Sequence, residues 1–150
     1  MVVVTEVQQR LVGTWRLVRW EEHDPDGTVS YPLGKDAVGQ IMYDAEGRMS
    51  AQLMQRDQMP FGSDDWRQAS ADEKANAWSN YFGYFGTYSI DEQAKKVTHH
   101  IEGSWFPNLV GQDQERITGS RENNSCSMQR RRGGRFESFG RKHERAKIHG

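Results

Sequence analysis

Two histidines and a glutamate stand close together in the sequence and are the residues best suited to chemistry. His99 and His100 are adjacent, and Glu102 follows two residues after His100. Alternate residues of a β-strand point to the same face, so His100 and Glu102 share one face and His99 points to the other. A carboxylate beside an imidazole can fix the tautomer of a general acid or base. The pair fits proton transfer of the isomerase or cyclase type, and it also fits a hydrogen-bonded pair on a solvated face.

A second set of residues suits the binding of a small hydrophobic or aromatic molecule. Arg48 and Gln52 are alternate residues of one expected strand, where they either anchor a ligand carboxylate or carbonyl or lie at the surface. The side chains that would line an apolar cavity are Tyr31, Met42, Tyr43, Tyr84, Tyr88 and Trp105. A cavity with many apolar and few polar groups favours a small hydrophobic ligand. The same side chains are also typical of a packed core.

Other kinds of site are not expected. His100 and Glu102 lack a third metal ligand, and the sequence has no phosphate loop, nucleophile elbow or dinucleotide fingerprint, so we predict neither a metal nor a cofactor. The only cysteine is Cys126, which excludes a disulfide framework.

No stretch resembles a secretory signal or approaches membrane-spanning length, and we expect a cytoplasmic protein without membrane or nucleic-acid partners. The sequence leaves the oligomeric state open.

Short strands separated by turn residues would position these side chains. Asp24-Pro25-Asp26-Gly27 and Asp44-Ala45-Glu46-Gly47 predict turns. The expected strands cover about residues 13–22, 28–31, 38–43, 48–54, 87–90, 96–103 and 109–117. Along 97–102 the alternation places Val97, His99 and Ile101 on one face. This pattern favours an antiparallel barrel.

Two helical segments are expected beside the strands. Residues 5–12 can form one short turn capped by Thr5. Ser70-Ala71-Asp72-Glu73 fits a capping box and predicts a helix over about 70–82. The apolar spacing of this helix would pack one face on the barrel, and Gly83 and Gly86 would end it. The residues of that face are Ala75, Trp78, Tyr81 and Phe82.

Four motifs occur in the same order as in a known family. They are Leu11-Val12-Gly13-Thr14-Trp15, Tyr31-Pro32-Leu33-Gly34, the segment Gly47 to Met54, and Thr98-His99-His100 running on to Phe106-Pro107-Asn108. Over about residues 7–117 the chain resembles the lipocalin-like domain proteins of bacteria and fungi. The resemblance implies an all-β antiparallel barrel of the calycin type with one flanking helix. A barrel of about eight strands can hold one small ligand, so we expect the binding of a small hydrophobic molecule in its cavity. The alternative is an isomerase or cyclase that uses the same cavity, with His100 as acid/base and Glu102 as its orienter, and the resemblance does not decide between the two.

The last 33 residues have a different composition. Residues 1–117 contain 11 Lys and Arg against 18 Asp and Glu, whereas residues 118–150 contain 9 against 3 and include the run Arg130-Arg131-Arg132-Gly133-Gly134-Arg135. We therefore divide the chain into a barrel domain, 1–117, and a basic tail, 118–150, at which the resemblance ends. Three interpretations of the tail are open: a disordered segment, a basic patch for an anionic partner, and a slip of the reading frame.

The frame-slip hypothesis rests on the genetic code. Read one base out of frame, Asn123 to Gln129 and Phe136 to Glu144 become strings of mixed apolar and polar residues that look like barrel strands and like the closing strands of the family. A slip near Arg116 and Ile117 would leave the barrel incomplete, because an unpaired edge would remain. A third functional hypothesis is therefore a defective barrel without activity.

Overall fold

The computed structural model describes residues 5–118, 124–130 and 137–141 of the 150. From residue 117 onward only the backbone of these residues is described. Most of the basic run between Arg130 and Arg135 therefore lies outside the described residues, and so do the side chains of the two last strands.

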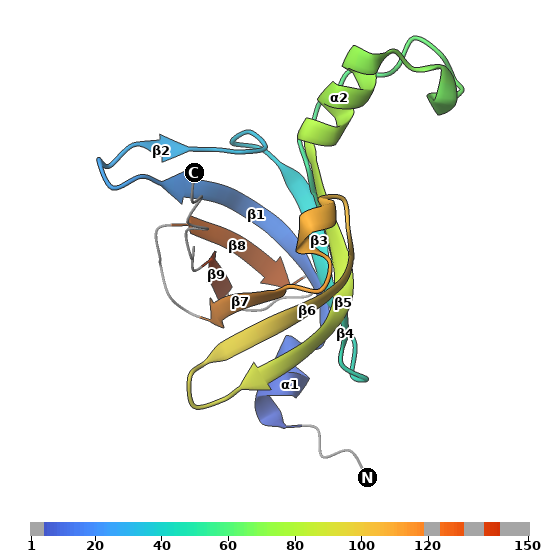
Figure 1. Ribbon diagram of the computed structural model, residues 1–150. Coiled ribbons are helices and arrows are strands. Elements are labelled where there is room, and N and C mark those ends of the chain that lie inside the picture. Colours follow the sequence, from blue (N-terminus) through green and yellow to red (C-terminus); the bar gives the residue numbers. More distant parts are fainter. Residues whose placement is uncertain (1–4, 119–123, 131–136, 142–150) are drawn as a thin grey trace, which may run out of the picture.

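The described chain is mostly strand (Figure 1). The strands are β1 (Gly13–His23), β2 (Val29–Ser30), β3 (Val38–Tyr43), β4 (Arg48–Met54), β5 (Tyr81–Asp91), β6 (Lys96–Ser104), β7 (Asp113–Thr118), β8 (Asn124–Arg130) and β9 (Glu137–Arg141). Two α-helices, α1 (Glu6–Leu11) and α2 (Ala71–Ser79), and two 3-10 helices, η1 (Trp66–Gln68) and η2 (Pro107–Leu109), join them.

Antiparallel pairing closes the sheet on itself. The order is β2-β1-β3-β4-β5-β6-β7-β9-β8, and β8 pairs in turn with β1. The register joins Trp15 to Ile41 between β1 and β3, and Ala51 to Tyr84 between β4 and β5. This confirms the expected all-β antiparallel architecture, and the β8–β1 pairing provides the closing contact that a tail without strands would lack.

Alternation along each strand builds the core inside the barrel. On β1, Trp15 and Leu17 are buried while Arg16 and Val18 between them are exposed. The Trp15 indole N–H donates to the Leu11 carbonyl at 2.7 Å, which ties the first strand to the end of α1. Thr5 caps α1 as expected, because its hydroxyl accepts from the Gln8 amide.

The helix predicted over 70–82 is shorter than expected. The capping box of Ser70 and Glu73 is present, but α2 ends at Ser79 and β5 already begins at Tyr81. Gly83 and Gly86 are strand residues and do not end a helix. The aromatic residues that follow Asn80 pair with β4 and β6, and this pairing outweighs their helical spacing.

The face of α2 does not pack along the barrel as predicted. No α2 residue is buried, and the helix projects from one end of the molecule together with the loop before it (Figure 1). Among the described residues, no helix is long and apolar enough to span a membrane.

Candidate functional site

A buried cluster of hydrogen bonds surrounds His99 on the inner face of the barrel. His99 lies on β6 between Val97 and Ile101, all three are buried, and His99 is 0% exposed. The Tyr43 hydroxyl lies 2.7 Å from Nε2 of His99, and the Tyr84 hydroxyl lies 2.7 Å from Nδ1. Facing positions of β3, β5 and β6 thus bring two phenols to one imidazole.

Burial sets the charge of this imidazole. Desolvation lowers the pKa of His99 well below its ordinary value of 6.5, and electrostatic interaction with Arg116 and His100 lowers the pKa further. His99 is therefore neutral at pH 7, with one ring nitrogen as donor and the other as acceptor. Arg116 donates from Nη2 to the Tyr84 oxygen at 3.3 Å, which favours a Tyr84 hydroxyl that donates to Nδ1. The ring N–H is then on Nε2 and faces Tyr43.

The pair predicted to act as acid and orienter lies on the outer face of the barrel. His100 contacts Ser89 at 2.9 Å and Asp113 at 2.7 Å, and its side chain is 40% exposed. Glu102 accepts from Arg48 at 2.8 Å, with both side chains about half exposed. Of the two placements that the sequence left open for His100, Glu102 and Arg48, the one in the cavity is therefore wrong and the solvated face is where they lie, although His100 pairs with Asp113 and Glu102 with Arg48. Val97, His99 and Ile101 take the inner positions of β6, and strand alternation turns the polar residues outward.

The other predicted ligand-binding residues divide between the two faces. Tyr43, Tyr84 and Tyr88 are buried inside the barrel. Tyr88 donates to the Asp44 carbonyl at 2.6 Å, and burial raises the pKa of its phenol above 10. Tyr31 is partly buried in the loop after β2, with Lys35 over its ring.

Two of these residues face away from the interior. Met42 is 47% exposed, and Gln52 is exposed on the outer face of β4. Their neighbours Ile41, Tyr43, Ala51 and Leu53 are buried, so the period of two along β3 and β4 directs Met42 and Gln52 outward. Neither can contact a ligand in the barrel.

Trp105 belongs to an aromatic cluster near the end of the barrel from which α2 projects. Its ring centroid lies 4.5 Å from that of Phe82, and Phe82 lies 5.2 Å from Trp20 and 5.5 Å from Tyr84. Trp105 packs against the core, yet its buried Nε1–H has no hydrogen-bond partner in the part of the chain that the structure describes. A buried donor without a partner is uncommon, because it loses its water without compensation. The nitrogen is itself closed to solvent, so an acceptor oxygen can reach it only where the neighbouring side chains move aside.

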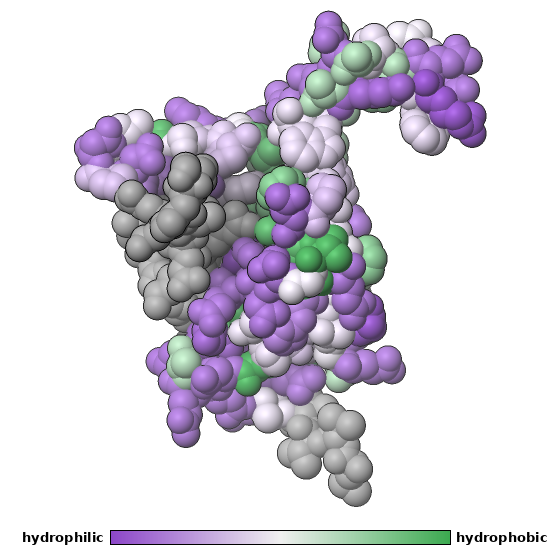
Figure 2. Space-filling view, viewed as in Figure 1, coloured by the Kyte–Doolittle hydropathy of each residue, from purple (hydrophilic) through white to green (hydrophobic). Residues whose placement is uncertain are grey.

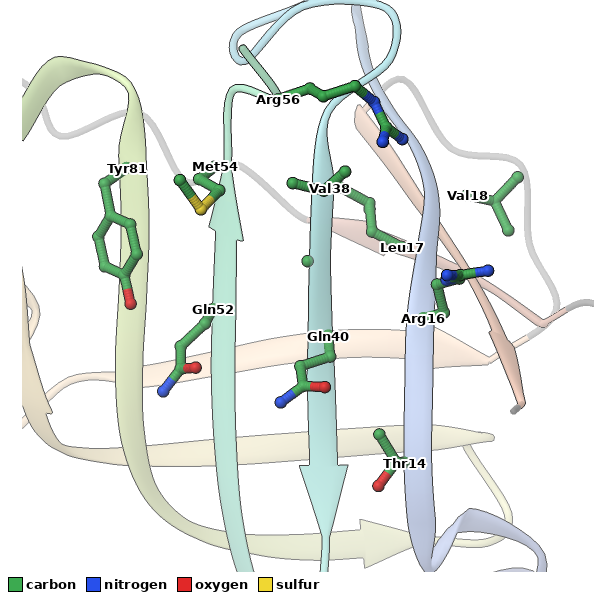
Figure 3. Close-up of a pocket in the computed structure, with 11 residues that line it drawn as sticks. Thr14, Arg16, Leu17, Val18, Val38, Gln40, Gln52, Met54, Arg56 and Tyr81 are labelled. Carbon is green, nitrogen blue, oxygen red and sulfur yellow. The ribbon is translucent and has the colours of Figure 1, made fainter. Parts of the chain in front are cut away.

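The cavity found among the described residues lies on the outer face of the sheet (Figure 3). It is a groove of about 590 Å³ across β1, β3, β4 and β5. Its lining residues are Thr14, Arg16, Leu17, Val18, Val38, Gly39, Gln40, Gln52, Met54, Arg56 and Tyr81. Of the predicted ligand-binding residues, Gln52 lines it.

Sequence reasoning missed the interior role of His99 and the contribution of Arg116, Phe82 and Trp20. The signal for His99 was present, because Val97 and Ile101 flank it at a spacing of two on an apolar face. Within the described ranges, no group of three or more His, Cys, Asp or Glu side chains is placed to hold a metal ion.

Comparison with known proteins agrees with this architecture. The lipocalin-like domain profile matches residues 12–145. The chain belongs to the lipocalin-like domain family. The match continues beyond Ile117, where we expected the family resemblance to end.

Among curated proteins, this lipocalin-like chain is similar to the 4'-hydroxy-3'-methoxypropiophenone carrier protein ppsC of Aspergillus oryzae. The two are 29% identical over 75 residues, which cover 46% of this chain and 68% of that protein. No solved structure matches the chain. The family and this carrier support the binding of a small hydrophobic ligand in general terms.

Proposed function

We propose that the protein binds a small aromatic molecule with a carbonyl oxygen, at the end of the barrel where Trp105 lies. The observation that carries the proposal is the buried Trp105 Nε1–H without a partner. A ligand oxygen at this position would accept that hydrogen bond and remove the cost of the unpaired donor. No protein acceptor among the described residues fulfils this role.

The surroundings of Trp105 favour an aromatic ligand. Phe82, Trp20 and Tyr84 present rings in edge-to-face and tilted arrangements around the same end of the barrel. Aromatic rings prefer such offset contacts, so a ligand ring could join the cluster in the same geometry. A site with many apolar groups and one or two directed polar groups is typical of small-molecule binding.

The chemistry of the similar carrier agrees with this choice. The ligand in the name of that protein is an aromatic ketone with a hydroxyl and a methoxy group. Such a molecule has a flat ring for the aromatic cluster and a carbonyl oxygen for the Trp105 N–H. We infer binding of this chemical class, with transport or storage of the ligand as the role.

Titration calorimetry with 4'-hydroxy-3'-methoxypropiophenone tests the site. The variant Trp105→Phe keeps a ring and removes the donor, so the affinity should fall about threefold to tenfold, the value of one hydrogen bond. The control Trp66→Phe alters a tryptophan that is 67% exposed outside the barrel, and it should leave the affinity unchanged. A ligand analogue without the carbonyl should bind the protein and Trp105→Phe equally well.

Two results would contradict the proposal. Wild-type protein that binds neither compound excludes this ligand class. Trp105→Phe that binds the ketone as tightly as the wild type excludes the indole N–H as the contact.

A proton-transfer enzyme of the isomerase or cyclase type is the second candidate. Its supporting observation is the neutral His99 imidazole, which has a phenol oxygen at 2.7 Å from each ring nitrogen. His99 would then take, inside the barrel, the acid/base role that the sequence suggested for His100. A base that enolises the ketone would exchange its α-hydrogens for deuterium in D₂O, which NMR detects. An enzyme should show exchange that His99→Gln abolishes and His100→Gln preserves, whereas a carrier should show none.

A further inference from the structure

The segment between β4 and β5 forms an arm that projects from the barrel. This arm, residues 55–80, contains η1 and α2 and stands clear of the body in the ribbon and in the space-filling view (Figures 1 and 2). Its two ends are held together where the Gln55 amide donates to the Asn80 carbonyl at 3.0 Å. Trp78 also contacts the barrel, with its ring 5.8 Å from that of Trp105.

Local hydrogen bonds give the arm a fixed shape without a core. The Glu73 carboxylate accepts from the amides of Gly62 at 2.8 Å and Ser70 at 2.7 Å. Lys74 donates to the Arg67 carbonyl at 3.2 Å, and the Asp65 side chain caps η1. The segment is therefore preorganised although it has little contact with the barrel.

Large apolar side chains of this arm face solvent. Met59 is 79% exposed, Trp66 is 67% exposed and Trp78 is 50% exposed. Exposed apolar groups on a preorganised segment are typical of a surface that contacts a partner. These exposed side chains add no hydrophobic stabilisation to the arm unless another surface covers them.

The groove on the outer face of the sheet complements the arm. Val18, Val38, Met54 and Tyr81 give it an apolar floor, and Arg16 lies at its side with no salt bridge among the described residues (Figure 3). No aspartate or glutamate lines the groove. An acidic, apolar segment would therefore fit it better than a basic one.

The charge of the arm has the sign that this groove requires. Residues 55–80 contain five acidic side chains against three basic ones, and one of the three, Arg56, lines the groove itself. Asp64 is exposed and lies two residues before the exposed Trp66. The arm thus carries an exposed carboxylate and an exposed large apolar ring within two residues of each other, with the Arg67 guanidinium 5.5 Å from the ring centroid.

We propose that two copies of the chain form a dimer in which each arm lies in the outer groove of the other copy. Trp66 would cover the apolar floor, and Asp64 would pair with Arg16. The groove lies at the base of the arm, because Met54 precedes the arm and Tyr81 follows it. A two-fold axis near the middle of two antiparallel arms would therefore bring each tip to the groove at the base of the other arm and make both contacts twice, as in a symmetric dimer.

Light scattering after size exclusion, at protein concentrations up to about 100 µM, measures the predicted assembly. The wild-type chain of 17.3 kDa should have twice that mass. Arg16→Glu and, independently, Trp66→Ala should give monomers with the circular dichroism of the wild type, because both side chains are exposed. The control Arg10→Glu on α1 places the same charge change outside the groove and should remain a dimer.

Charge exchange tests the specific contact. The double variant Arg16→Glu with Asp64→Arg should restore the dimer, since the opposite charges then face each other again. A wild-type monomer overturns the proposal, and so does a dimer that Arg16→Glu leaves intact. If the wild type is a monomer that binds decanoate and Arg16→Glu weakens that binding, the groove is a site for a small carboxylate and not for the arm.

Discussion

The two adjacent histidines of β6 differ in what surrounds them, and this difference predicts the effect of the same substitution at each. His99→Gln should lower the free energy of unfolding by about 2 kcal/mol or more, because Tyr43 and Tyr84 lose their shared buried partner. His100→Gln should change it by less than about 1 kcal/mol, since that side chain lies on the outer face. Urea denaturation at pH 7.5 measures both values. Equal losses would contradict the assignment of His99 to the interior.

The buried imidazole also predicts how stability depends on pH. The pKa of His99 is lower in the folded protein than in the unfolded chain, so the unfolded chain binds the extra proton as the pH falls below 6.5. Stability is therefore complete above pH 6.5 and is lost as the pH falls toward the folded pKa. Between pH 7.5 and 5.5 the wild type should lose about 1 kcal/mol more than His99→Gln. If the wild type and His99→Gln lose the same free energy of unfolding between pH 7.5 and 5.5, the His99 imidazole does not contribute to the pH dependence of stability.

The sequence predicted which residues of β6 share a face but not which face is internal. Val97 and Ile101 favoured an apolar side at His99, whereas the imidazole and carboxyl of His100 and Glu102 suggested a reactive pair. The ring of strands decides between the two faces, and strand order depends on contacts far apart in the chain. Residue types alone therefore predicted the alternation along β6 but did not decide which face His100 and Glu102 occupy.

Among the structural elements, the bulge between β5 and β6 depends on a glycine. The pairing register shifts between Phe85 and Gly86, and a Cβ on Gly86 would overlap the His100 carbonyl oxygen. Gly86→Ala should therefore lower the free energy of unfolding by about 3 kcal/mol. Gly62→Ala adds the same methyl group to the arm, where the nearest atom is 3.6 Å away, and should have little effect on thermal unfolding. A Gly86→Ala variant with the wild-type melting temperature would contradict the close approach.

Local patterns predicted most strands because their signals are local. The expected strands 38–43 and 48–54 have the bounds of β3 and β4, and the predicted capping box of α2 is present. The start of β5 was missed because Trp78, Tyr81 and Phe82 have helical spacing, and only pairing with β4 draws Tyr81 and Phe82 into a strand. The aromatic cluster around Trp105 was likewise hidden, since its members come from β1, β5 and the segment after β6.

At the scale of the whole molecule, the C-terminal part needs its own test. The frame-slip hypothesis predicts that the transcript, read one base out of frame from about codon 117, is open and encodes two alternating strands. The family match to residue 145 and the pairing of β8 with β1 are what a chain read in a single frame would give. Sequencing of the gene and its transcript distinguishes a frame slip from a single reading frame. A stop codon in the shifted frame would exclude the frame-slip hypothesis.

The division of the chain at residue 117 is a separate prediction about cooperativity. If residues 1–117 are a complete domain, a chain that ends there should unfold at the same temperature as the full protein. The strand order predicts the opposite, because removal of β8 and β9 leaves one edge of β1 and one edge of β7 without partners.

The truncated chain should then melt at a lower temperature, over a broader range, and bind a hydrophobic dye that the full chain does not bind. Circular dichroism measures the melting temperature and the breadth of the transition of both chains, and fluorescence measures the binding of the dye. A full-length chain in which only residues 131–136 are replaced by Gly and Ser is the matched control, since it preserves β8 and β9. If the truncated chain melts as sharply and at the same temperature as this control, β8 and β9 are not part of the folding unit and the barrel is stable without its closing strands.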